Sequence, residues 1–144
     1  MVTYIFVFIF LITGTIFDLK SRSVPLIVFP IFGIPGICLS LIIGQLKTGQ
    51  ILDWAFGILL GLVFIAISLI SDKKLGMGDA FAILVTGIYL GGCAASAVLM
   101  YAMMAASILS IIILAMKKAS GKTELPFIPF LLLGCIIQQI WSNT

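Results

Sequence analysis

The chain has 144 residues, of which 62% are hydrophobic and 9% are charged, and its net charge at neutral pH is +3. A soluble domain of this size needs far more polar surface, so the composition predicts an all-α membrane protein without a separate soluble module. A small positive charge in such a chain reports its orientation in the membrane, and we infer no nucleic-acid partner from it. We therefore expect one membrane-embedded domain over residues 1–144, surrounded by lipids.

Six apolar runs predict a bundle of six transmembrane helices. They cover residues 2–17, 26–43, 51–70, 80 to about 90–98, a following run that ends at 116, and 126–141. The stretch 80–116 would be about 55 Å long as one helix, against a hydrocarbon core of about 30 Å, so we expect a break near Gly91 and Gly92. The first run would be only about 24 Å long, and this mismatch would draw its end toward the hydrocarbon or thin the bilayer. Kinks are expected at Pro30, Pro35, Pro126 and Pro129.

The basic residues support six spans. In that arrangement one side of the membrane carries seven of them, namely Lys20, Arg22, Lys73, Lys74, Lys117, Lys118 and Lys122, and only Lys47 lies opposite. Five spans would remove this asymmetry. The positive-inside rule then places both termini outside and loops 18–25, 71–79 and 117–125 in the cytoplasm. The chain is expected to be a multi-pass protein of the cell membrane, and any functional residues in these three loops would face the cytoplasm.

The residue types that are missing restrict the chemistry. The chain contains no histidine, which removes Ser-His and Cys-His catalysis and the commonest metal ligand. Its three cysteines are isolated in apolar sequence, so we expect packing roles and no metal site. General acid–base chemistry must therefore come from the five carboxylates, which are Asp18, Asp53, Asp72, Asp79 and Glu124.

Asp18 and Asp79 are the strongest candidates, because two separate loops bring them to the same membrane face. Asp18 closes the first apolar run, and Asp79 follows Gly76 and Gly78 just before the fourth. Each has a simpler interpretation: Asp18 as a polar stop paired with Lys20 or Arg22, and Asp79 as a helix N-cap after a flexible loop. As a pair, however, two close carboxyls cannot both ionise cheaply, so one keeps a proton while the other activates water. The glycines would permit close approach of an extended peptide.

The other three carboxylates have weaker claims to chemistry. Asp53 is next to Trp54 at the opposite interface, which is typical of residues that anchor a helix there. Asp72 and Glu124 lie in cytoplasmic loops, where we expect solvated side chains that could contact a substrate. Small residues such as Gly57, Gly61, Ala105 and Ala106 are expected to let helices approach closely.

Three segments in order resemble the type IV prepilin peptidases, membrane aspartic proteases of the GxGD class. Residues 17–25 hold an aspartate, basic residues and a Val-Pro pair, and residues 75–80 read Leu-Gly-Met-Gly-Asp-Ala. Residues 125–130 resemble the segment that opens the family's last span, although Ile128 stands where a glycine is usual. The resemblance implies Asp18 and Asp79 as the catalytic dyad of an aspartic endopeptidase, with Gly76 and Gly78 shaping the site.

That family removes a short basic leader from pilin-like precursor proteins at the cytoplasmic membrane face, in type IV pilus assembly and related protein secretion. The resemblance implies a hydrolase without a cofactor or metal. Larger members carry an additional amino-terminal segment, often with four cysteines, and methylate the new terminus. This chain has neither the length nor the cysteines of those larger members. It resembles the small peptidase-only form, so no methyltransferase activity is expected.

Three other functions remain open from the sequence. A relative of presenilin or signal peptide peptidase would share the GxGD segment, but the Pro-Ala-Leu segment typical of those proteins is missing. A small carboxylate-based transporter or proton-relay subunit would place its acidic residues near the middle of the bilayer. A structural assembly subunit would need neither aspartate. The oligomeric state and the identity of the precursor are not predicted.

Overall fold

The computed structural model describes residues 2–21, 25, 27–43, 50–70, 76–116 and 126–142. Within these residues the chain forms six helices and no strand, which confirms the all-α prediction. The helices are α1 (Val2–Ser21), α2 (Val28–Ile43), α3 (Ile51–Ile70), α4 (Met77–Leu90), α5 (Gly92–Ala115) and α6 (Ile128–Ser142).

Three of the six helices, α1, α3 and α5, are long and apolar enough to cross a membrane, by length and composition. The other three, α2, α4 and α6, are apolar but shorter, with 16, 14 and 15 residues. The six-span arrangement therefore stays a prediction, although each predicted apolar run has its own helix.

The predicted break between the fourth and fifth runs is confirmed at Gly91. This residue has φ 78°, a left-handed conformation that favours glycine, and its N–H donates to the Gly87 carbonyl oxygen at 3.0 Å. The chain then enters α5 directly at Gly92. The turn therefore splits the long apolar stretch into two separate helices.

Two details of the predicted helices are wrong. Helix α1 continues to Ser21 and has 20 residues, or about 30 Å, so the expected mismatch of a 24 Å first span does not arise. Of the four prolines at which a kink is expected, only Pro35 lies in the interior of a helix. Pro30 and Pro129 occupy the first turns of α2 and α6, and Pro126 precedes α6. A first turn has no internal partner for its N–H groups, so these prolines fit without a kink.

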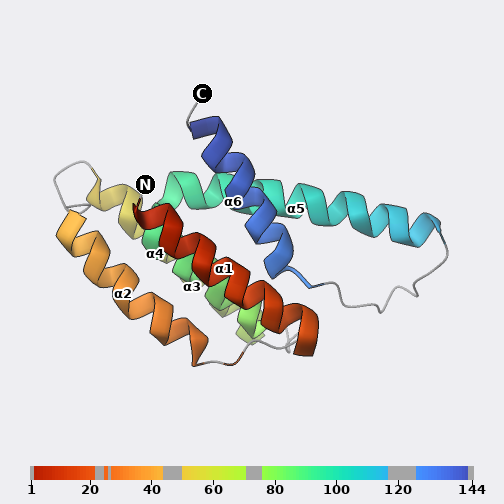
Figure 1. The fold of residues 1–144 in the computed structure, drawn as a ribbon, viewed down its shortest axis with the longest axis horizontal. Coiled ribbons are helices and arrows are strands. Elements are labelled where there is room, and N and C mark those ends of the chain that lie inside the picture. Colours follow the sequence, from red (N-terminus) through yellow and green to blue (C-terminus); the bar gives the residue numbers. More distant parts are fainter. Residues whose placement is uncertain are drawn as a thin grey trace.

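The first four helices lie side by side, whereas α5 runs across them and extends beyond the bundle, with α6 packed between α5 and α1 (Figure 1). Helices α3 and α4 are antiparallel and very close. A Cβ atom on Gly57 would lie 2.5 Å from the Gly87 carbonyl oxygen, and one on Gly61 would collide with the backbone of Leu84. The prediction that Gly57 and Gly61 allow close approach of helices is therefore confirmed.

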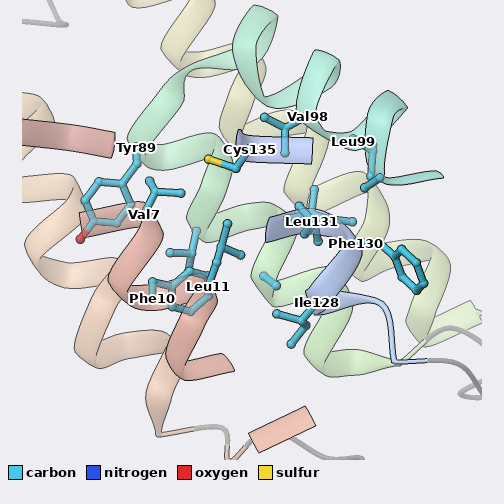
Figure 2. Close-up of a cluster of buried hydrophobic side chains, with 14 of the residues drawn as sticks. Val7, Phe10, Leu11, Tyr89, Val98, Leu99, Ile128, Phe130, Leu131 and Cys135 are labelled. Carbon is cyan, nitrogen blue, oxygen red and sulfur yellow. The ribbon is translucent and has the colours of Figure 1, made fainter. Parts of the chain in front are cut away.

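Helix α4 contributes most to the core, because nearly all of its residues from Ala80 to Tyr89 are buried. Side chains of α1, α2, α5 and α6 complete the core, and the Phe6 and Tyr89 rings stack with their centroids 6.3 Å apart. Figure 2 shows this cluster, in which the labelled residues are Val7, Phe10, Leu11, Tyr89, Val98, Leu99, Ile128, Phe130, Leu131 and Cys135. The packing role predicted for the cysteines is confirmed for Cys135, whereas Cys38 and Cys93 are exposed.

Candidate functional site

Asp18 belongs to the buried stripe of α1. Val7, Leu11, Gly14 and Asp18 are spaced three or four residues apart, so they share the helix face that packs on the core. Asp18 is only 8% exposed, while Lys20 is on the exposed surface. Two residues apart, they cannot face each other across a helix turn. The predicted pairing of Asp18 with Lys20 is therefore wrong, and its alternative, pairing with Arg22, lies outside the described residues.

The partner of Asp18 is the beginning of α6. The Ile128 N–H donates a hydrogen bond to Asp18 Oδ2 at 3.3 Å. The first N–H groups of a helix have no acceptor inside it, so a carboxylate placed there satisfies one of them and is stabilised by the helix dipole. One turn earlier in α1, a Cβ atom on Gly14 would lie 3.2 Å from Ile128 Cγ2, so the two helices are in contact here. Asp18 thus joins the end of α1 to the start of α6.

Asp79 lies in the first turn of α4, but it is not the N-cap. Gly76 holds that position, and its carbonyl oxygen accepts hydrogen bonds from the Asp79 N–H at 3.0 Å and the Ala80 N–H at 3.2 Å. The Asp79 carboxyl group folds back over Gly76, where a Cβ atom would lie 2.8 Å from Oδ2. Gly76 has φ −58° and ψ 125°, which any residue can adopt. Glycine therefore fits here because it leaves space for the carboxyl group.

The fold brings Asp18 and Asp79 to the same end of the molecule. Helices α1 and α4 are in contact and run in opposite directions, because Phe6 stacks on Tyr89 while Asp18 interacts with Asp79. Burial and, secondarily, the negative charge of Asp18 raise the pKa of Asp79 to about 7. The two carboxyls are thus within electrostatic range, and they favour a state in which only one is ionised near neutral pH.

The remaining predicted site residues are less informative. Gly78 is a half-buried residue in the first turn of α4, directly before Asp79. Asp72 and Glu124 lie outside the described residues, so their predicted contact with a substrate stays a prediction. In the part of the chain that the structure describes, no three acidic, cysteine or histidine side chains gather as metal ligands would.

The opposite end of α4 contains polar contacts that the sequence did not predict. Asp53 Oδ1 accepts a hydrogen bond from the Cys93 N–H at 2.8 Å, so Asp53 supplies an acceptor for one of the unpaired N–H groups at the start of α5. The Ile88 carbonyl oxygen accepts two side-chain hydrogen bonds, from Trp54 Nε1 at 3.1 Å and from Ser40 Oγ at 3.0 Å. Spacing along the chain could not reveal these pairs, because they depend on how α2 and α3 pack against α4.

Comparisons of the chain with models of protein families, with curated proteins and with solved structures found no match. Any assignment of function therefore depends on the residues themselves and on the geometry described above.

Proposed function

We propose that this chain is a membrane aspartic endopeptidase of the type IV prepilin peptidase kind, which removes the basic leader from pilin-like precursors at the cytoplasmic face. One observation carries the proposal. Asp18 and Asp79 come from separate helices of a very apolar chain, and they lie close enough for the charge of one to raise the pKa of the other. Buried carboxyls are costly, and their pairing is typical of sites that activate water.

The proposed reaction is hydrolysis of one peptide bond in the precursor. The ionised aspartate takes a proton from a water molecule, whose oxygen attacks the carbonyl carbon, while the neutral aspartate gives its proton to the carbonyl oxygen. The tetrahedral intermediate then collapses, the C–N bond breaks, and a proton passes to the leaving amine. The products are the free leader and a shortened precursor with a new amino terminus.

The contacts of the two aspartates favour one division of roles. Burial raises the pKa of Asp18, but the hydrogen bond that Asp18 accepts from the Ile128 N–H opposes this rise and stabilises the carboxylate, whereas Asp79 has no such opposing contribution, so Asp18 is the better general base. Asp79 is buried beside that charge and has a pKa near 7, so it is the better proton donor.

The helix directions are compatible with the topology that the basic residues predict. Helix α1 is antiparallel to α6 as well as to α4, because Asp18 at its end contacts Ile128 at the start of α6. Helix α3 is antiparallel to α4. In a six-span chain with both termini outside, these contacts put Asp18 and Asp79 on the cytoplasmic side.

The test is processing of a co-expressed pilin-like precursor by Asp18→Asn and Asp79→Asn variants. Both should abolish cleavage while the protein remains in the membrane at the wild-type level. Asp53→Asn is the matched control, because it removes a carboxylate at the far end of the molecule and keeps an acceptor oxygen for the Cys93 N–H. Full processing by either site variant would refute the proposal.

A proton-relay subunit is a second candidate, because a carboxyl with a pKa near 7 can bind and release protons at physiological pH. Against it, both carboxyls lie at the ends of their helices, whereas a relay across the bilayer needs groups near the middle. Proton flux into vesicles that contain the purified protein, lost in Asp79→Asn, would favour this candidate over the peptidase.

A further inference from the structure

The two helices that begin at the site are too short to cross a typical bilayer. Helix α4 has 14 residues, or about 21 Å. Helix α6 has 15 residues, or about 22 Å. A hydrocarbon core of about 30 Å exceeds both lengths by about 8 Å. Helix α4 begins two residues before Asp79, and α6 begins at Ile128, whose N–H donates to Asp18.

The pairing of α3 and α4 shows how far α3 extends past α4 and past the level of Asp79. Gly57 faces Gly87, Gly61 faces Leu84, and Asp53 approaches Gly91, so the numbers of facing residues add to 144 or 145. At the far end Leu90 therefore lies beside residues 54 and 55, and α3 begins three or four residues earlier, at position 51. Continuing the same register places Asp79 beside residues 65 and 66 of α3. Helix α3 runs four or five residues further, to position 70, which is about 7 Å beyond the level of Asp79.

Exposed apolar side chains lie beyond the aspartates on both α1 and α3, next to the exposed Lys20 on α1. Leu69 and Ile70 of α3 are 63% and 81% exposed, and Leu19 of α1 is 63% exposed. We call these three residues the collar. Exposed leucine and isoleucine at the end of a membrane helix favour contact with acyl chains. Asp79 therefore lies deeper than the apolar boundary that Leu69 and Ile70 set at the end of α3.

We propose that the collar binds acyl chains, and that the bilayer must thin locally around α4 and α6 before Asp18 and Asp79 meet cytoplasmic water. Bilayer thickness would then regulate the site. A thick bilayer covers the carboxyls because thinning costs more free energy there, whereas a thin bilayer leaves them open. The expected effect on cleavage depends on the proposed peptidase function, but the expected effect on water access to the site does not.

Water access can be measured without any activity. In a chain with Cys38→Ala and Cys93→Ala, and with the buried Cys135 retained, Met77→Cys reports on the start of α4 and Ile70→Cys on the collar. Both are labelled with a membrane-impermeant maleimide in phosphatidylcholine vesicles whose monounsaturated chains have 14 to 22 carbons. Labelling of Met77→Cys should fall about fivefold or more over this series, and more steeply than labelling of Ile70→Cys. Equal slopes would overturn the proposal.

Cleavage of the precursor in the same vesicles tests regulation. The rate should fall with increasing chain length, and Leu69→Lys with Ile70→Lys should weaken this dependence, because lysines at the collar draw the headgroups toward the site. The matched control, Ile51→Lys with Leu52→Lys, shortens the apolar part of α3 at its other end and should keep the dependence. A rate that is independent of chain length would overturn the regulation. If labelling depends on bilayer thickness but the precursor is not cleaved in any of the lipids, the recessed site is supported and the peptidase function is refuted.

Discussion

Replacement of Gly76 by alanine should separate activity from stability. A Cβ atom at this position would lie 2.8 Å from Asp79 Oδ2, whereas ordinary contact begins at 3.4 Å, so the carboxyl oxygen must move by about 0.6 Å. A misplacement of about 1 Å at a catalytic group can cost about a hundredfold in rate, so we expect roughly a tenfold loss of cleavage. The backbone angles of Gly76 suit alanine, which should leave the free energy of unfolding unchanged or raise it by about 0.5 kcal/mol.

The assay compares initial rates of precursor cleavage with thermal unfolding of the same protein in detergent. Gly33→Ala is the control, because its Cβ would make only an ordinary contact with Val85 Cγ2 at 3.9 Å, and it should keep the wild-type rate. A wild-type rate in Gly76→Ala would show that Gly76 does not shape the site. A loss of rate accompanied by an equal loss of stability would also contradict the reasoning.

Four further predictions concern stability and pH. Gly61→Ala should lower the free energy of unfolding by about 2 kcal/mol, measured by thermal unfolding, because the new methyl group collides with α4 backbone; an unchanged melting temperature would contradict this packing. Asp53→Ala should cost about 1 kcal/mol through loss of the hydrogen bond from the Cys93 N–H, whereas Asp53→Asn should cost little. The raised pKa of Asp79 means that the folded protein binds a proton more tightly than the unfolded chain, so stability should fall as pH rises from about 4 to about 7, and cleavage should fall above pH 7. Asp18→Asn should lower the pKa of Asp79 but leave it above its ordinary value, because burial is the larger cause of the rise. Infrared titration of the protonated Asp79 carboxyl would detect this change. An unchanged pKa would show that the two carboxyl groups do not interact.

The helices were largely predictable from the sequence because their signals are local. Hydrophobic length alone separates six apolar runs, and a stretch of 37 residues that is too long for one span requires a break, which the Gly91–Gly92 pair provides. The helix ends were less predictable. Helix α1 continues past Phe17 through polar residues because Asp18 is held by the α6 backbone, and nothing near Asp18 in the sequence indicates that contact.

The candidate site was predictable in its acidic residues and not in its backbone partners. Asp18 and Asp79 stand out because carboxylates are rare in this chain. The Ile128 N–H and the space over Gly76 depend on tertiary packing, in which every amide and most glycines look alike in the sequence. The residue type at position 128 differs from the usual glycine of the family it resembles, but its contribution here is a main-chain N–H, which any residue except proline supplies.

The paired hydrogen bonds at the Ile88 carbonyl oxygen give α4 a fixed pivot. Trp54 of α3 and Ser40 of α2 both donate hydrogen bonds to this oxygen, so two neighbouring helices hold the end of α4. Asp79 lies nine residues from that pivot, a lever arm of about 13 Å. A rotation of α4 by only about 4° about its Ile88 end would move the Asp79 carboxyl group by about 1 Å toward or away from Asp18. Small rotations of α4 are therefore enough to change the distance between the two carboxyl groups.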